Sequence, residues 1–402
     1  VNQLIRPNAF ICPQGRAAEF LLFSVLSEVL REMDPEKQYS IPNNGHFDTT
    51  EANIASVGIE PVNFFQPTIF EDFPADQQDK RNPFKGDMDL DRLTAFIEEK
   101  DRDAIPMIYL TITNNTIAGQ PVSMANIKAV REIADKYDLP LFFDACRFAE
   151  NAYFIKQFEE GYSDRSINSI VSEMFACADA FTISFKKDGM ANMGGGLFLR
   201  DKGPFQKRFS TKEDIGVRLK EKQIGTFGND SYGGLSGRDI MALAVGLQQV
   251  TNQAYLRSRI GQVQYFARRL SENGVPVVLP AGGHAVYLNM DKFMEDVDVK
   301  FDDFTGIGLC IELIRHYGVR ANEMGPFAWE WDQKNEAQRA GTINLVRFAV
   351  PRNIYAKEHF DYAVAAITEL HKHRHKIPKM RITRGAKLRM RHFQSGLEPV
   401  YS

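Results

Sequence analysis

The first half of the chain alternates short apolar runs with amphipathic helical patterns, and this alternation limits the possible fold more than any other feature. Residues 107–113 and 139–145 are mostly apolar runs of strand length, and residues 123–137 between them place apolar side chains on one helix face. The same reasoning predicts a further helix and two further strands, over residues 15–33, 180–185 and 196–199. Strands that alternate with helices predict an α/β domain with a largely parallel sheet, in which ligands gather at the carboxyl ends of the strands.

The second half of the chain has a different pattern. A long helical stretch covers residues 238–273 with one expected break. After it we expect strands at residues 275–279, 284–288 and 343–350, and helices at about 309–317 and 359–373. Residues 72–87 and 327–341 are polar and predict loops. Since 402 residues suffice for two cores, we expect a large domain over residues 1–250 and a smaller α+β domain over 251–402.

Composition narrows the choice of partners and compartment. The net charge of −3 gives no electrostatic reason to expect nucleic acid as a partner. No apolar run reaches the length of a membrane span, and no signal peptide opens the chain, so we expect a cytoplasmic protein without a membrane partner. The four cysteines are far apart and form no CxxC pair, which predicts free thiols. Val1 is not an initiator methionine, and the chain is expected to begin inside a larger protein.

The segment Gln14, Gly15 and Arg16 stands at the start of the first predicted helix. A helix N-terminus offers backbone N–H groups and a favourable dipole to an anion. Gly15 lets the backbone approach a ligand closely, and Arg16 can add a positive charge. The segment would suit a phosphate group, although such residues at a helix start more often serve as a cap or as surface.

Three further segments carry residues with chemical potential. Asp144 ends a buried strand, where it either pairs with Arg147 or holds a pyridine nitrogen in its protonated form. Lys186 and Lys187 follow the next predicted strand; they form either a solvated turn or the site of an imine with an aldehyde. Arg347, on a strand of the second domain, is either an ion-pair partner or a clamp for a substrate carboxylate.

The order of these segments resembles the fold-type I enzymes of pyridoxal phosphate (PLP), which have an aspartate aminotransferase-like fold. Longer stretches resemble one family, the aromatic amino acid β-eliminating lyases, which comprise tryptophanase and tyrosine phenol-lyase. These stretches are residues 118–157, 184–198, 231–239, 281–288 and 346–355. The resemblance extends from about Ile11 to His392, nearly the whole chain. It implies PLP as cofactor, K⁺ as a monovalent cation, an amino acid substrate and a homotetramer built from two catalytic dimers.

The resemblance also assigns roles to single residues. Lys187 would form the Schiff base with PLP and then remove the substrate α-proton, and Asp144 would pair with the ring nitrogen. The remaining cofactor contacts would be Gln14, Gly15, Arg16 and Ser184 around the phosphate, Lys186 beside Lys187, Phe47 stacked on the ring, and Asn115 and Arg147 at the ring hydroxyl oxygen. Arg347 would bind the substrate carboxylate, Asn192 would lie in the segment that holds K⁺, and His284 would lie near the active site.

Three positions distinguish the two lyases. Asp48 and His392 resemble tryptophanase residues, whereas the phenol-lyases carry threonine at the position of Asp48. Met324 stands where the phenol-lyases place an arginine that recognises the phenol hydroxyl, and an apolar side chain cannot form that hydrogen bond. These residues favour the conversion of tryptophan to indole, pyruvate and ammonia. The alternatives are a tyrosine phenol-lyase, another PLP lyase or an aldolase.

The chain also departs from the family pattern. The family has a segment before the position of Val1 that supplies part of the small domain, a cation ligand and an active-site tyrosine from across the dimer interface. Residues 114–119 and 327–341 diverge, and the segment around His392 contains a small insertion, so the substrate could differ from tryptophan. The chain is therefore expected to be a fragment of a longer lyase or a homologue that has lost activity.

Overall fold

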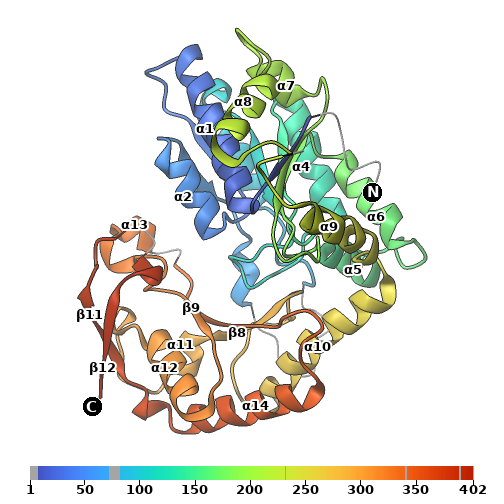
Figure 1. Cartoon of the computed structure of the whole chain (residues 1–402). Helices are drawn as coiled ribbons and strands as arrows, with labels where there is room; N and C mark the ends of the chain where they lie inside the picture. Colours follow the sequence, from blue (N-terminus) through green and yellow to red (C-terminus); the bar gives the residue numbers. More distant parts are fainter. Residues whose placement is uncertain (1–7, 72–81, 231, 340–341, 389–390, 402) are drawn as a thin grey trace. The chain divides into compact units, whose positions relative to one another are not determined.

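The computed structural model describes residues 8–71, 82–230, 232–339, 342–388 and 391–401. The chain divides into two compact units, and each has its own sheet and core (Figure 1). The first unit comprises Val1–Ile69 with Asn82–Arg257, and the second comprises Phe70–Arg81 with Ser258–Ser402. In the described residues, no helix is both long enough and apolar enough to cross a membrane.

The first unit is built on a seven-stranded mixed sheet, which confirms the predicted α/β class. The strand order is β1 (Asn8–Cys12), β7 (Gly195–Leu199), β6 (Ala180–Ser184), β5 (Leu141–Asp144), β4 (Ile108–Thr111), β2 (Ser40–Asn43) and β3 (Glu60–Asn63). Each neighbouring pair from β6 to β3 is parallel: β6 with β5, β5 with β4, β4 with β2, and β2 with β3. Strand β7 is antiparallel to both of its neighbours, β1 and β6. The strands β4 to β7 lie where the sequence predicts them.

Helices cover both faces of this sheet (Figure 1). Successive residues of β5 point to opposite faces: Phe142 contacts Phe205 with ring centroids 5.9 Å apart, and Phe143 contacts Phe175 at 6.2 Å. The helices of the unit are α1 (Gly15–Met33), α2 (Asp48–Ser56), α3 (Leu90–Glu99), α4 (Met124–Lys136), α5 (Phe148–Phe158), α6 (Ile167–Ala176), α7 (Pro204–Phe209), α8 (Ile215–Phe227) and α9 (Gly237–Gln249). Because both faces are covered, the strands read as continuous apolar runs.

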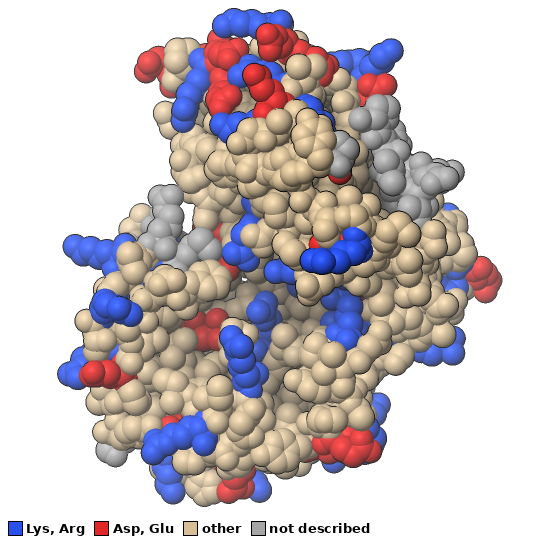
Figure 2. Space-filling model, viewed as in Figure 1, with Lys and Arg blue, Asp and Glu red and all other residues tan. Residues whose placement is uncertain are grey.

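Local chemistry explains where several of these helices begin. Ser123 and Ser166 each accept a hydrogen bond from a backbone N–H of the first turn, of α4 and α6 respectively. The long predicted helix is in fact two, α9 and α10 (Gln253–Glu272), separated by the one expected break. Figure 2 shows basic and acidic side chains mixed at the end formed by α1, α7 and α8, where Arg218 lies 3.0 Å from Glu32.

The second unit contains a three-stranded antiparallel sheet in the order β8 (Ala285–Asn289), β10 (Leu345–Ala349) and β9 (Asn322–Met324). A separate hairpin pairs β11 (Lys379–Arg384) with β12 (Gly396–Val400). The helices are α11 (Met290–Phe293), α12 (Thr305–Tyr317), α13 (Glu336–Arg339) and α14 (Lys357–Lys372). Apolar residues of α10, α12 and α14 pack with those of β8 and β10 in one core, so this unit is the predicted α+β type.

Two sequence predictions for this unit were wrong. Residues 275–279 form no strand, only an isolated bridge between Val277 and Leu288, because Pro276 and Pro280 lack the N–H groups that a ladder needs. The predicted loop 327–341 contains a 3-10 turn, Trp331–Gln333, and α13. Of the predicted loop 72–87, residues 72–81 lie outside the described residues.

Candidate active site

Six strands of the first unit end at the same edge of the sheet. All strands except β7 run in one direction, and the antiparallel β7 begins at the edge where they end. A candidate residue lies at or shortly after the end of five of these strands, β1, β2, β4, β5 and β6: Gln14, Phe47, Asn115, Asp144 and Lys187. The topology therefore brings together residues that are distant in the sequence, at the edge where α/β sheets bind ligands.

The turn between β1 and α1 forms a close-packed cradle. A Cβ atom on Gly15 would lie 2.0 Å from Oγ of Ser184, and one on Gly195 would lie 2.1 Å from the carbonyl carbon of Gln14. The N–H of Gly194 donates a hydrogen bond to the carbonyl oxygen of Pro13 over 2.8 Å. Only glycine fits at these two positions, and the first turn of α1 consequently lies against the Ser184 hydroxyl.

Positive charge surrounds this cradle. The first turn of α1 carries no acidic residue. The pKa of Lys186 lies below its ordinary value, first because the side chain is partly buried and then because Lys187 and Arg16 lie near it. A helix N-terminus, a hydroxyl group and neighbouring cations form a donor set that fits a phosphate.

The residues beside the cradle fit a flat aromatic group that carries an aldehyde. Nζ of Lys187 lies 5.4 Å from the centroid of the Phe47 ring. Asp144 is buried at the end of β5 and accepts a hydrogen bond from the N–H of Cys146 over 3.2 Å. Asn115 and Arg147 are buried as well. A phosphate site, an amine, an aromatic face and a buried carboxylate are the groups that PLP requires, so the residues present fit this cofactor.

Sequence reasoning missed a second buried carboxyl group in this region. Glu19 on α1 accepts a hydrogen bond from Oγ1 of Thr50 over 2.6 Å. Burial, followed by the charge of Asp144, raises the pKa of Glu19 to about 7, and Lys187 lowers it. The sequence signal that could have found it is the position of Glu19, an acid within an otherwise apolar stretch of α1.

Cys146 is a further residue that the sequence did not single out for this site. Its Sγ accepts a hydrogen bond from the N–H of Ser184 over 3.2 Å, which joins the ends of β5 and β6. Burial and then Asp144 raise the pKa of the Cys146 thiol to about 11, so the thiol is protonated at neutral pH. All four cysteines are free thiols, as predicted.

Two other predicted residues of the first unit lie in less enclosed places. Asp48 begins α2 and accepts a hydrogen bond from the N–H of Thr49 over 2.6 Å. Asn192 is exposed in the turn between β6 and β7. In the part of the chain that the structure describes, no group of three or more His, Cys, Asp or Glu residues could hold a metal ion.

Three predicted residues of the second unit lie close together on its sheet. Arg347 on β10 pairs with Asn322 on one side and Tyr287 on the other, and Leu345 pairs with Met324. Residues directly opposite one another point to the same face, so Arg347, Met324 and Tyr287 share one face. Nε2 of His284 lies 3.1 Å from the Tyr287 hydroxyl oxygen, which brings His284 to the same group.

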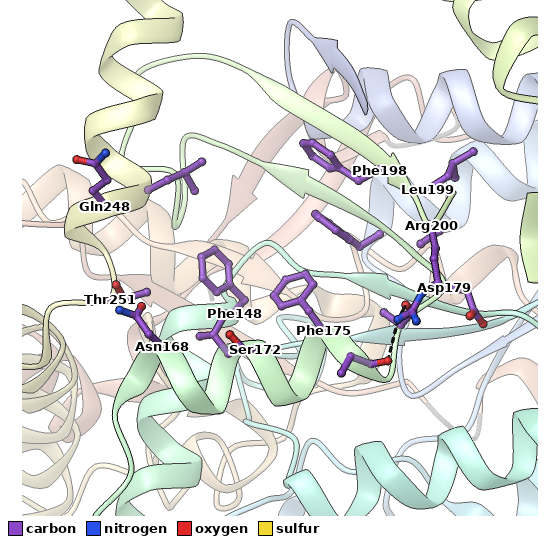
Figure 3. A pocket seen from close by; sticks show the side chains of 16 residues that line it. Phe148, Asn168, Ser172, Phe175, Asp179, Phe198, Leu199, Arg200, Gln248 and Thr251 are labelled. Atoms are coloured by element: carbon purple, nitrogen blue, oxygen red, sulfur yellow. Dashed lines mark hydrogen bonds between the residues drawn. The ribbon is translucent and has the colours of Figure 1, made fainter. Parts of the chain in front are cut away.

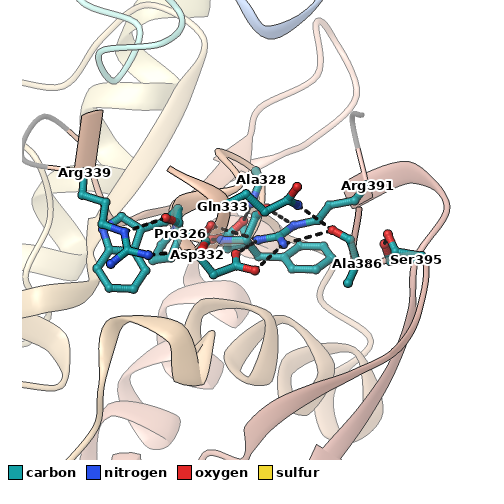
Figure 4. A network of polar contacts seen from close by, with 12 residues as sticks. Pro326, Ala328, Asp332, Gln333, Arg339, Ala386, Arg391 and Ser395 are labelled. Atoms are coloured by element: carbon teal, nitrogen blue, oxygen red, sulfur yellow. Dashed lines mark hydrogen bonds and ion pairs between the residues drawn. The ribbon is translucent and has the colours of Figure 1, made fainter. Parts of the chain in front are cut away.

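His392 lies in a 3-10 turn, Arg391–Phe393. Arg391 is fully buried and donates hydrogen bonds to the carbonyl oxygen of Phe327 and to Asp332 (Figure 4). One polar network therefore joins the turn of His392 to Phe327 and Asp332 of the divergent segment. Nothing in the sequence linked these two segments.

The first unit also contains a cavity of about 650 Å³ (Figure 3). Its lining includes Phe175, Phe198, Asp179 and Arg200, and Arg200 donates to the carbonyl oxygen of Ala176 over 2.8 Å. The cavity lies where β6 begins and β7 ends, which is the opposite edge of the sheet from Ser184 and Lys187. None of the predicted site residues lines it.

Comparison with known proteins gives the same family as the sequence motifs. The family profile of the beta-eliminating lyases matches residues 5–366. A tryptophanase of Rhodobacter capsulatus is 41% identical over 402 residues, which cover 99% of this chain and 82% of that protein. A tryptophanase of Salinibacter ruber is 39% identical, with 96% and 76% covered. A tyrosine phenol-lyase of Clostridium tetani is 37% identical, with 92% and 75% covered.

Solved structures with low sequence identity share the fold. The serine palmitoyltransferase of Sphingomonas wittichii superposes with a TM-score of 0.55 at 10% identity and covers 92% of this chain and 73% of that one. A serine palmitoyltransferase of S. paucimobilis, with a bound PLP–myriocin aldimine, gives a TM-score of 0.54 at 12% identity and covers 91% and 72%. Together with the family match, these likenesses show that the chain belongs to the beta-eliminating lyases, PLP-dependent enzymes of fold type I, and that it is similar to tryptophanases.

Proposed function

We propose that this lyase eliminates the aromatic side chain of tryptophan and releases indole, pyruvate and ammonia. The observation that carries the proposal is the placement of Lys187. Its amine lies 5.4 Å from the Phe47 ring and follows the strand end that carries Ser184, the hydroxyl group of the phosphate cradle. An amine in this place can both hold the cofactor and reach the substrate Cα.

When bound, PLP supplies an electron sink for the electrons released at Cα. Lys187 holds the cofactor and then removes the α-proton as a general base. Asp144, a buried carboxylate, keeps the proton on the ring nitrogen. Asn115 and Arg147 orient the ring through its hydroxyl oxygen, and Arg347 binds the substrate carboxylate through its planar guanidinium group.

The choice of tryptophan over tyrosine depends on three residues. Met324 is 7% exposed and apolar, so it offers no partner to a phenol hydroxyl, and burying that hydroxyl without a partner would be costly. Asp48 and His392 are the groups that we assign to proton movement at the indole ring. Because tryptophanases and a tyrosine phenol-lyase are similar to the chain at nearly equal identity, these residues decide the proposal.

We assign to this enzyme a homotetramer of two catalytic dimers, K⁺ bound near Asn192, and a cytoplasmic location. Exposed apolar side chains support an assembly: Tyr232 is 72% exposed, and Met241 on α9 is 67% exposed. Val245, one turn further along α9, is 48% exposed as well, and neighbouring exposed apolar side chains on one helix face are typical of surfaces that a partner subunit covers. The experiment is sedimentation of the complete gene product with and without K⁺.

The central test uses the complete gene product with PLP in K⁺ buffer. We expect a visible absorption band from the covalently bound cofactor, and release of indole and pyruvate from tryptophan. The Lys187→Ala variant should lose the band and at least about 10⁴-fold in turnover, as expected when a nucleophile and base is removed. A wild type that stays colourless with PLP, or that releases pyruvate from tyrosine but not from tryptophan, would contradict the proposal.

A further inference from the structure

We propose that Arg391 is a positioning residue for the departing aromatic ring, because it joins the loop that follows Met324 to the turn that carries His392. The inference rests on the proposed function, in which Met324 contacts the leaving group and His392 serves its protonation. All residues that carry the inference belong to the second unit.

The guanidinium group of Arg391 has a complete set of partners (Figure 4). Its Nε donates to the carbonyl oxygen of Phe327 over 2.9 Å, and both of its terminal nitrogens donate to the Asp332 carboxylate. The same two nitrogens also donate to the carbonyl oxygens of Pro326 and Ala386, over 3.4 and 3.5 Å. Arginine has five N–H groups in a fixed plane, and lysine cannot reproduce this pattern.

Two aromatic rings enclose the guanidinium group. Its central carbon lies 4.8 Å from the centroid of the Phe327 ring and 5.4 Å from that of Phe304. Arg391 has no exposed surface. Its position is therefore fixed by packing as well as by hydrogen bonds, and the backbone of the Arg391–Phe393 turn, with His392 in it, follows from that position.

A second buried group, Glu323, holds the same part of the loop. Glu323 directly precedes Met324, and its carboxylate oxygens accept hydrogen bonds from the N–H groups of Phe327 and Ala328, each over 3.0 Å. Burial raises the pKa of Glu323 to about 7, and the backbone N–H groups of Phe327, Ala328 and Gly325, followed by nearby His392, act in the opposite direction. Glu323 and Arg391 thus both hold the backbone of residues 326–328, which shortly follow Met324.

Stability alone explains this arrangement poorly. The guanidinium group of Arg391 is fully buried, although the side chain of Asp332 is 31% exposed, and a buried charge pays a large desolvation cost that an apolar side chain of similar volume avoids. A guanidinium group that reaches from the turn of His392 to Pro326, Phe327 and Asp332 does, however, fix the geometry between the two groups that face the leaving group. Protonation of a ring carbon depends on such geometry, since an error of about 1 Å can cost about a hundredfold in rate.

The test compares two substrates in the Arg391→Lys variant of the complete gene product with PLP. Tryptophan leaves as indole only after its ring carbon is protonated. In 3-chloroalanine the C–Cl bond breaks with its electron pair on chloride, which needs no proton. Both substrates need Lys187 and Arg347 equally. We expect kcat for tryptophan to fall by about a hundredfold, and kcat for 3-chloroalanine to stay within about twofold of the wild type.

Two further variants serve as control and second probe. Arg381→Lys alters an exposed ion pair, in which Arg381 lies 2.8 Å from Glu398, and should change neither rate. Asp332→Asn keeps the shape of the partner but removes its charge, and should reproduce the selective loss in weaker form. If Arg391→Lys fails to fold, as thermal unfolding would show, the Asp332→Asn variant carries the test.

Equal losses on both substrates, or no loss on tryptophan, would overturn the inference. A wild type that processes 3-chloroalanine but not tryptophan would refute the proposed substrate alone. The same variants would then be compared on the aromatic amino acid that the enzyme does process, with the same selective loss expected. A wild type inactive on all of them would overturn both the proposed function and the inference.

Discussion

The two groups of candidate residues are held in place by different means. In the first unit each residue follows the end of a strand, so the backbone ladder of the sheet fixes its position. In the second unit the loop after Met324 is held by side chains, chiefly Glu323 and Arg391. The candidate residues of the first unit (the cofactor side) therefore depend on sheet topology, and those of the second unit (the leaving-group side) depend on a few buried polar contacts that a single substitution can break.

Removal of the Arg391 side chain tests whether buried polar contacts hold the loop after Met324. Arg391→Leu leaves the buried carbonyl oxygen of Phe327 without a donor and removes both charge-assisted hydrogen bonds to Asp332, and we expect the free energy of unfolding of the second unit to fall by about 3–5 kcal/mol. Denaturant unfolding of the complete gene product measures this loss. The double variant Arg391→Leu/Asp332→Leu should recover part of it, whereas Arg381→Leu at the exposed pair should cost about 0–1 kcal/mol.

Unfolding curves of Arg391→Leu and Arg381→Leu that coincide would show that the buried network does not hold the loop. The leaving-group side would then depend on backbone structure in the same way as the cofactor side.

The cradle at Gly15 offers the corresponding test in the first unit. In Gly15→Ala the new Cβ would meet Oγ of Ser184 at 2.0 Å, so the helix start or β6 must shift. We expect the dissociation constant of PLP to rise by about a hundredfold, or about 3 kcal/mol, as measured by absorbance titration of the apoprotein. Gly225→Ala on α8 is the control, since no atom lies within 4 Å of its Cβ.

The control should leave PLP binding unchanged and stabilise the helix by about 0.5–1 kcal/mol. An unchanged PLP affinity in Gly15→Ala would mean that the first turn of α1 does not hold the phosphate.

The same contrast explains which features the sequence could predict. The runs 139–145 and 180–185 are buried on both faces of the sheet. Their apolar character therefore predicts β5 and β6, and with them the positions of Asp144 and Lys187 at the strand ends. β3 was missed because Glu60 is exposed and its neighbours are only half-buried, which leaves no apolar signal. The pairing of Arg391 with Asp332 joins residues 59 positions apart. No local pattern encodes such a contact, so the network of the second unit could not be predicted.

Glu19 gives a smaller effect and tests how strictly the cofactor side excludes water. Burial and Asp144 raise its pKa to about 7, while Lys187 and the hydrogen bonds from Thr50 and Asn53 act in the opposite direction. A carboxyl group with a raised pKa binds its proton more tightly in the folded state. Its contribution to stability is therefore complete at low pH and is lost as the pH rises through about 7.

We expect the free energy of unfolding of Glu19→Gln, relative to wild type, to increase by about 2 kcal/mol between pH 5 and pH 8, because glutamine has no proton to lose. Denaturant unfolding of the apoprotein at both pH values measures this difference. Glu98→Gln is the control: a hydrogen bond from Tyr137 lowers the pKa of this exposed group, so its loss should show the opposite and much weaker trend. If the difference in free energy of unfolding between Glu19→Gln and wild type does not change with pH, water reaches the carboxyl group of Glu19. The cofactor side would then be more open to water than the burial of Glu19 suggests.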